Sequence, residues 1–236
     1  MMRTLPFLLL PLLASLGIAT GWAQNVKYPP LSEYMMMRDA EIALARSAAP
    51  SKISARATVK TLSQSGYTVA QEGDNGFVCL VLRGWGAPSF TPLGERLLVY
   101  DAKLRAPICY DPVASRTVLP MQEFRAKHGM AGKDPDGIAR EVTMAYARGT
   151  LPRVEGVAFA YMWSAGQYLG ANAGSWRPHM MVYAPYYKNT MLGNNEPGGT
   201  LPFVSDDEGT PFTVIVVPVH ENTAIQPAMA HNHKPE

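Results

Sequence analysis

The chain has 236 residues, with 21 Lys or Arg against 19 Asp or Glu, so its formal net charge is only +2. So small a charge provides no strong field for nucleic acid or for an anionic membrane surface. The hydrophobic fraction of 47% is normal for a globular protein, while 20 Gly and 20 Pro residues indicate many turns and argue against a long-helix bundle. Composition therefore favours a folded globular protein over a disordered, fibrous or polytopic membrane chain.

The first 23 residues have the pattern of a secretory signal peptide. Arg3 precedes an apolar run from Leu5 to Leu16, and small residues follow as far as Ala23, where a signal peptidase would cut. The alternative is a retained anchor or a buried N-terminal helix, but the apolar run is short for a bilayer span. We therefore expect residues 1–23 to be removed and the remainder to be exported to the periplasm or the extracellular space of a bacterium, with no membrane span left.

Export changes the meaning of the two cysteines, Cys79 and Cys109. In an oxidising compartment an even number of cysteines predicts a disulfide bond. Both residues lie in runs that are typical of strands, so we expect a bridge between neighbouring strands. The alternative is a pair of buried thiols that act as small apolar side chains. A redox catalyst is not indicated, because no Cys-x-x-Cys spacing is present.

Helix signals are few along the chain. An apolar stripe that includes three consecutive methionines predicts a helix over 32–48, and a weaker helical pattern covers 121–127. The clearest helix begins after Asp134 as the N-cap, has Pro135 in its first position and ends near Gly149.

Strand signals outnumber the helix signals and do not alternate with them. The first three runs are separated by short polar breaks, and Asn75-Gly76 is typical of a tight hairpin turn, which predicts a β-meander. Asp111-Pro112 is expected to begin a turn. The runs with strand character are 57–62, 67–71, 77–83, 96–100, 108–110, 157–163, 179–184 and 212–219.

This pattern favours the α+β class, with a mostly antiparallel sheet that starts with an N-terminal β-meander and carries two or three packed helices. We expect one domain over 24–225 and a flexible tail over 226–236, where Pro, Ala and His dominate.

His179 is the first candidate for catalysis, because a histidine at the start of a strand can act as a general base. Ser164 is a candidate nucleophile, and Asp206 would complete a serine–histidine–aspartate trio, although the G-x-S-x-G pattern is absent. His179, His220 and Asp206 also offer nitrogen and oxygen ligands for a divalent metal. The alternatives are that His179 holds a neighbouring carbonyl group and that the acidic run at Asp206 is ordinary turn chemistry. No other cofactor is expected, since G-x-G-x-x-G, the P-loop and H-E-x-x-H are all missing.

Aromatic and amide side chains crowd into the segment 161–187 and the loop that follows it. Such side chains suit a concave site for a sugar, a peptide or another neutral ligand. The candidate ligand-binding residues are Tyr161, Trp163, Trp176 and Tyr183. The alternative is that these rings only cover the sheet.

We therefore expect an exported binding or structural protein of the envelope that has no catalytic activity. Its partner would be a small molecule, a glycan or an envelope protein, and not a nucleic acid. The competing hypothesis is a metal-assisted or serine-type hydrolase centred on His179.

Overall fold

A computed structural model of the chain describes residues 27–85, 100–170, 177–197, 199–205 and 208–228. The expected signal peptide, Trp176, Asp206, most of the strand run 96–100 and most of the expected tail lie outside the described residues. The strands are β1 (Thr58–Ser63), β2 (Gly66–Gln71), β3 (Val78–Leu82), β4 (Ala106–Tyr110), β5 (Ala158–Met162), β6 (His179–Tyr183), β7 (Phe203–Val204) and β8 (Val214–Pro218). In the part that the structure describes they form one eight-stranded sheet in the order β2-β1-β3-β4-β5-β6-β8-β7.

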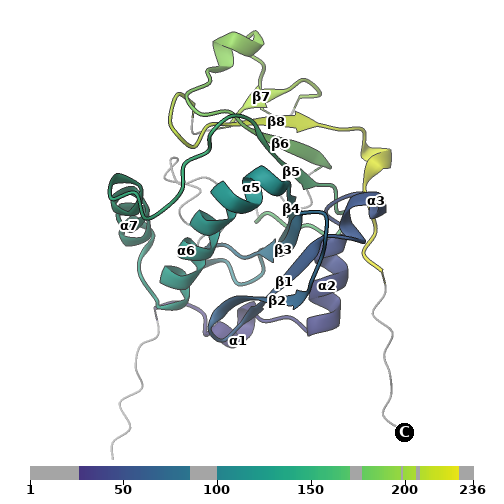
Figure 1. Ribbon diagram of the computed structural model, residues 1–236, viewed down its shortest axis with the longest axis vertical. Helices are drawn as coiled ribbons and strands as arrows, with labels where there is room; N and C mark the ends of the chain where they lie inside the picture. The colour runs from purple at the N-terminus through teal and green to yellow at the C-terminus, as the bar shows by residue number, and fades with distance from the viewer. Residues whose placement is uncertain (1–26, 86–99, 171–176, 198, 206–207, 229–236) are drawn as a thin grey trace, which may run out of the picture.

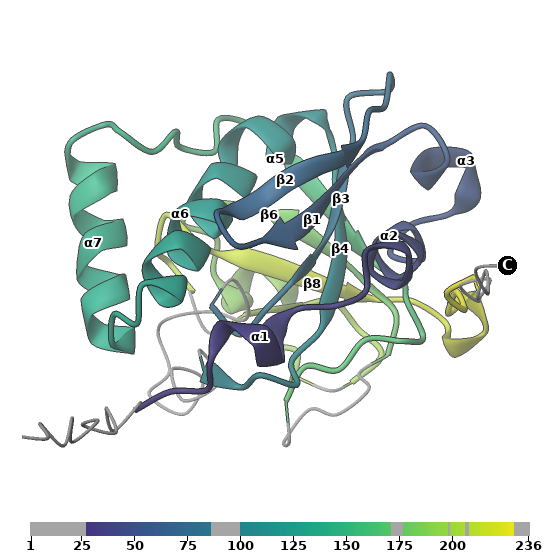
Figure 2. The ribbon, with the colours of Figure 1, turned by 90° about the horizontal axis from the view of Figure 1, so that it is seen from below.

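Helices cover both faces of this sheet (Figure 1). They are α1 (Leu31–Tyr34), α2 (Arg38–Arg46), α3 (Ser51–Ser54), α5 (Pro112–Thr117), α6 (Leu119–Met130) and α7 (Pro135–Ala147), with short 3-10 helices η2 (Asn189–Leu192) and η3 (Glu221–Thr223). Figure 2 shows α5, α6 and α7 on one side of the sheet and α2 and α3 on the other. The α+β class is confirmed, with more helices than the two or three that we predicted. No described helix is long and apolar enough to cross a bilayer.

Proline and aspartate begin two of these helices in the same way. The Asp134 carboxylate accepts a hydrogen bond of 2.8 Å from the Gly137 amide at the start of α7, as the sequence predicts. Asp111 accepts an equivalent bond of 2.7 Å from the Ala114 amide and starts α5. The expected turn at Asp111-Pro112 is therefore the beginning of a helix, because Ala114 packs into the core and stabilises a helix of only six residues.

The helix predicted over 32–48 is interrupted at the three methionines. The backbone is extended at Met35, with φ −73° and ψ 151°, and again at Met37, with φ −60° and ψ 132°. The interruption allows the two halves to pack in different places, since Tyr34 is buried beside Trp85 while α2 places Leu44 against the sheet. Tertiary packing overrides the helical pattern here.

The first three strands are not a simple meander. The hairpin β1–β2 is antiparallel as predicted, but β3 lies next to β1 and runs parallel to it. The turn at Asn75-Gly76 packs against the beginning of β1 instead of joining adjacent strands. The Asn75 amide group donates to the Ile53 carbonyl at 2.8 Å, and the Thr58 amide donates to the Phe77 carbonyl at 2.9 Å. Because of these contacts, β3 pairs with the side of β1 that β2 does not occupy, and β2 is left at the edge of the sheet.

The bridge between Cys79 and Cys109 is confirmed and lies at the centre of the sheet. The two cysteines face each other in the register of β3 and β4, with 4.0 Å between their Cα atoms. Both are fully buried in the cluster that α2 forms with this face of the sheet. The opposite face packs against α5 and α6 through a second cluster that includes Ile108, Tyr110 and Tyr183.

A buried ion pair links the N-terminal helices to the sheet. The Arg83 guanidinium lies 2.9 Å from a carboxylate oxygen of Glu41, and neither side chain is more than 1% exposed. Arg83 also donates to the Tyr34 carbonyl at 2.7 Å, and the same Glu41 oxygen accepts from the Leu62 amide at 3.1 Å. The pair thus connects α1, α2, β1 and the end of β3.

Candidate functional site

Ser164 is held in a buried hydrogen-bond network. Its hydroxyl oxygen lies 2.6 Å from that of Ser47 and accepts a bond of 3.1 Å from the Gly166 amide. The Ser47 hydroxyl donates its proton to the Leu44 carbonyl, so Ser164 must be the donor in the bond between the two serines. The Ser164 proton is therefore directed at Ser47, and the side chain is completely buried. This arrangement joins the end of α2 to the end of β5.

His179 begins β6, where its neighbours in the sheet are Met162 and Pro218. Its side chain is only 3% exposed, and Nδ1 lies 3.0 Å from the Arg177 carbonyl. Because a carbonyl can only accept, Nδ1 carries the proton in this bond. Burial lowers the pKa of His179 to about 4, although the bond to Arg177 acts in the opposite direction. The imidazole is therefore neutral at pH 7.

The depressed pKa of His179 predicts a loss of stability in mild acid. The unfolded chain, with an ordinary histidine pKa, binds a proton as the pH falls below about 6.5, whereas the folded protein does not until about pH 4. The contribution of His179 to the free energy of unfolding is thus complete above about pH 6.5 and is lost as the pH falls from 6.5 to 4. We expect the free energy of unfolding to decrease by about 2 kcal/mol from pH 7 to pH 4.5. Urea unfolding at the two pH values should show this loss, and His179→Gln should reduce it. His220→Gln is the control, because His220 is exposed.

Two of the three proposed metal ligands, His179 and His220, lie among the residues that the structure describes. No group of three or more His, Cys, Asp or Glu side chains that could hold a metal ion occurs among the described residues. His179 is buried, while His220 is exposed and its Nδ1 accepts from the Asn222 amide at 3.3 Å. Asp206 lies outside the described residues, so a metal site that includes it stays a prediction.

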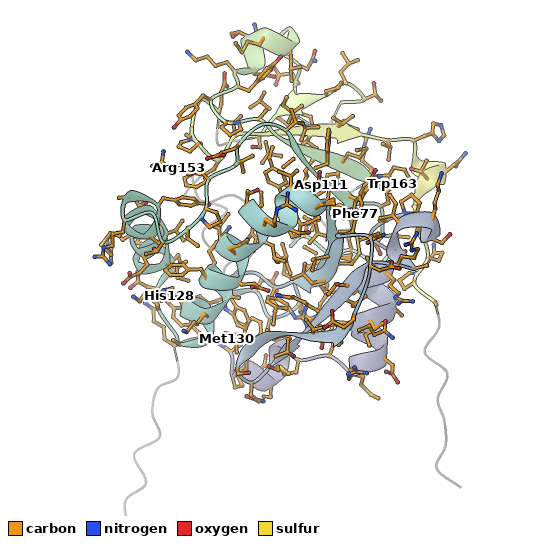
Figure 3. The ribbon with its side chains drawn as sticks, in the orientation of Figure 1. Phe77, Asp111, His128, Met130, Arg153 and Trp163 are labelled. Atoms are coloured by element: carbon orange, nitrogen blue, oxygen red, sulfur yellow. A yellow bond between two sulfur atoms is a disulfide. The ribbon has the colours of Figure 1, made fainter. Side chains whose placement is uncertain are left out.

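The described aromatic residues among those predicted to bind a ligand lie on two faces of the sheet. Tyr161 and Trp163 lie on the α2 face, with their rings 5.4 Å apart, and Phe77 packs beside Tyr161 at 6.4 Å. Tyr183 lies on the opposite face, against α5 and α6. Figure 3 shows Phe77 and Trp163 well separated from Arg153, which lies near α7. Among the described candidates, Tyr161 and Trp163 therefore lie apart from Tyr183, while Trp176 lies outside the described residues.

A cavity of about 100 Å³ lies on the face that contains Tyr183. We call it the tyrosine pocket, because its walls include Tyr146 from α7, Tyr183 from β6 and Tyr186 from the turn that follows β6. Phe212 packs edge-to-face on Tyr146 with 5.0 Å between ring centroids, and Arg153 is the only charged side chain among the described lining residues. The rest of this lining is aliphatic or proline.

Tyr183, which lines the pocket, is paired with Tyr110 beneath it in the core. The rings of Tyr110 and Tyr183 are 6.4 Å apart on either side of β5, where the small residues Ala158 and Ala160 leave room for them. Burial is the main cause that raises the pKa of both hydroxyl groups, so they stay protonated. Their hydrogen-bond interaction with each other has a smaller effect, which raises the pKa of Tyr110 and lowers that of Tyr183.

The mouth of the pocket carries a tyrosine in an unusual backbone conformation. Tyr186 has φ +64°, and the Tyr187 amide donates to the Ala184 carbonyl at 3.1 Å. With Pro185 in the second position, these features define a type II turn, whose third position normally requires Gly or Asn. The Tyr186 amide also donates to the Thr210 carbonyl at 2.8 Å, and its side chain is 57% exposed. A bulky residue is thus held in a strained position beside the opening.

Two arginines give this region a positive charge. Arg125 and Arg153 both act to lower the pKa of Tyr146, although burial has the larger effect and raises it to about 12. Asp111 is the acidic group that affects Tyr183, and its carboxylate already caps α5. The environment of the pocket therefore favours a ligand with an acceptor or a negative charge.

Comparisons with known proteins identify no relative from which to transfer a function. The chain matches no protein-family model, no curated protein and no solved structure at a significant level. The interpretation of the tyrosine pocket therefore depends on its own chemistry.

Sequence reasoning did not find most of this pocket. Tyr146 and Arg153 lie about 60 residues before Phe212 in the chain, and the three residues show no common pattern. Tyr186 belongs to the aromatic segment 161–187. A tyrosine after Pro185 could have indicated an unusual turn, since Gly or Asn is expected after the proline of a type II turn.

Proposed function

We propose that the protein is a small-ligand-binding domain without catalytic activity and that the tyrosine pocket is its binding site. The conformation of Tyr186 is the main support. An exposed tyrosine at φ +64° costs about 1–2 kcal/mol relative to a glycine, and glycine would make the same turn. Strain of this kind is typical of functional positions, where a side chain is needed for contact with a ligand.

The walls of the pocket support the same conclusion. Tyr146, Tyr183 and Phe212 provide aromatic surface around a cavity of about 100 Å³, and Arg153 is the only charged side chain among the described lining residues. A concave site with apolar and aromatic walls and few polar groups is typical of a site for a small molecule.

The hydrolase hypothesis has less support. A serine nucleophile has to pass its proton to a base, whereas the Ser164 proton is directed at Ser47. His179 stays neutral and uses Nδ1 for the Arg177 carbonyl. Both arrangements are those of structural side chains.

Export to the periplasm or the extracellular space remains part of the proposal. The disulfide bond between Cys79 and Cys109 supports it, because such bonds persist in oxidising compartments. A binding protein of the envelope is consistent with that location.

A titration with phenol tests the binding function. Phenol is a single ring with one hydroxyl group, and we expect it to shift the NMR signals of Tyr146, Tyr183 and Phe212 with a dissociation constant in the millimolar range. Signals of Tyr161 and Trp163, on the other face of the sheet, provide the internal control. Shifts confined to that other face, or no shifts at all, would refute the proposal.

Tyr186→Gly should separate stability from binding. The substitution removes the strain of a positive φ, so we expect the free energy of unfolding to rise by about 0.5–1 kcal/mol. Phenol binding should weaken at the same time, because the ring at the mouth is lost. Tyr186→Phe is the matched control, which keeps both the ring and the strain. Urea unfolding and the NMR titration measure the two effects, and a variant that is more stable and binds normally would contradict the assignment of the mouth.

A further inference from the structure

We propose that the protein forms a weak symmetric dimer through an apolar patch on the face of the sheet that carries α2. The patch lies on β5, β6 and β8, beyond the strands that α2 covers. We call it the sheet patch, and its residues are Phe159, Tyr161, Met180, Val182, Ile215 and Val217. This inference does not depend on the tyrosine pocket, because Tyr183 of that pocket lies on the opposite face.

The strand register places the side chains of the patch next to one another. The residues that face each other across β5, β6 and β8 form two rows, which are Tyr161 with Met180 and Val217, and Phe159 with Val182 and Ile215. The two rows lie two residues apart along each strand, so they are on the same face. The first row continues into β4 and β3 as Cys109 and Cys79, which lie in the cluster under α2. The patch is therefore the continuation of the face that α2 covers.

The side chains of the patch are apolar or aromatic, and all six are only partly buried. Tyr161 packs against the cluster under α2, whereas the other five pack against none of the buried clusters that the described residues form. The alternate residues of the same strands belong to the core on the opposite face. An antiparallel sheet with one face in water normally has polar side chains on that face. An apolar second face thus indicates a surface that another layer covers.

The composition of the patch favours a second copy of the chain as this layer. A two-fold symmetric interface brings the same surface of both copies together, so it has to be complementary to itself. Apolar side chains meet this condition, and the patch contains no charged residue that would face its own copy. The formal net charge of +2 also leaves little repulsion between two whole chains.

The position of α2 leaves space for a second sheet. In Figure 1, β6 and β8 lie at the top of the view and α2 lies near the bottom, so the helix is on one side of the patch. Two sheets pack about 10 Å apart, and a helix with its side chains is about 10–12 Å thick. The three strands of the second copy therefore fit beside α2, in the same layer. A two-fold axis parallel to the strands places β6 of one copy over β6 of the other.

The size of the patch predicts a weak association. Three strands about 4.8 Å apart, with about five residues each, give a flat area of about 250 Å². A stable interface buries about 800 Å² on each partner, so this patch is typical of a transient dimer. We expect a dissociation constant of about 100 µM, which places about 15% of the chains in dimers at about 10 µM and about 70% at about 500 µM.

Sedimentation equilibrium of the full mature protein over this concentration range measures the association. NMR of the methionine methyl groups locates it. The Met180 signal should shift with concentration, whereas the signal of Met144, which is 38% exposed on α7, should not. A protein that stays monomeric at about 500 µM would overturn the proposal, as would a shift of Met144 without one of Met180. A Met180 signal that moves only on addition of phosphatidylglycerol vesicles would show that a membrane covers the patch, which also overturns the dimer.

A charge placed in the patch tests whether the second copy is the partner. Val182 lies on β6, the middle strand of the patch, so Val182→Lys brings two like charges close to the two-fold axis and should weaken association at least tenfold. Val69→Lys is the matched control, because Val69 is a strand residue outside the patch that is 47% exposed. Circular dichroism and urea unfolding establish that both variants fold.

Mixing two variants separates a symmetric dimer from other kinds of association. Neither Val182→Lys nor Val182→Glu should associate alone, while an equal mixture of the two should recover association, because opposite charges then meet at the axis. A mixture that stays monomeric would contradict the symmetric arrangement. If Val182→Lys associated as strongly as Val69→Lys, the patch would not be the interface. The concentration dependence of Met180 in the unmodified protein decides the matter if the Val182 variants do not fold.

Discussion

Replacing Arg83 by Met should lower the free energy of unfolding by about 3–5 kcal/mol, the largest effect that we expect from any single substitution. The substitution leaves the Glu41 carboxylate buried without its charged partner, and it also removes the bond to the Tyr34 carbonyl. Methionine has a volume close to that of the arginine chain, so little of the loss should come from an empty space. Urea or guanidinium unfolding of the purified variant measures the effect.

A surface pair provides the matched control for this prediction. Arg56 lies 2.9 Å from the Asp74 carboxylate, but both side chains are mostly exposed, so Arg56→Met should cost much less than Arg83→Met. The double variant Arg83→Met with Glu41→Leu should recover much of the loss, because it removes the unpaired charge. A cost for Arg83→Met as small as that for Arg56→Met would show that the buried pair contributes no more than a surface pair.

Removing the disulfide bond should cost about 3–4 kcal/mol, as estimated from the loop of 30 residues that it closes. The variant Cys79→Ala with Cys109→Ala releases this constraint on the unfolded chain. It also trims two buried side chains in the cluster under α2, which adds a smaller packing loss.

A comparison with the reduced wild-type protein separates these two contributions. Unfolding in the presence of a thiol reductant removes the bridge but keeps the sulfur atoms, so it should show the chain-entropy part alone. Mass spectrometry of the starting material should confirm the loss of two hydrogens that the bridge requires. A double variant as stable as the oxidised protein would contradict a structural role for the bridge.

Local signals in the sequence predicted much of the fold. The cap at Asp134 and the β-branched runs located α7 and most of the strands, because these features act over a few residues. The break at Met35–Met37 and the parallel pairing of β1 with β3 were not predictable in the same way. The break and the strand pairing both depend on the hydrophobic cluster against which each segment packs. The residues of these clusters are distant from one another in sequence, so a local pattern does not reveal them.

The candidate site was less predictable than the fold. Tyr183 belongs to an aromatic-rich segment that the sequence shows. The spacing of residues does not show that Tyr183 packs near Tyr110 and lines a pocket with Tyr146 and Phe212. Arg153 and Phe212 have no local signature and line one pocket only because Tyr146 of α7 packs against Phe212. The sequence places His179 at the start of a strand but does not reveal that its side chain is buried beside the Arg177 carbonyl.

The position of Cys79 and Cys109 beneath α2 has a consequence for the order of events during biogenesis. Neither sulfur can be reached by an oxidising enzyme or a small thiol once the helix has docked, because both residues are fully buried. The bridge must therefore form while the chain is still open. The same cover then shields the bond from reducing agents, so that its lifetime is governed by how often the protein opens.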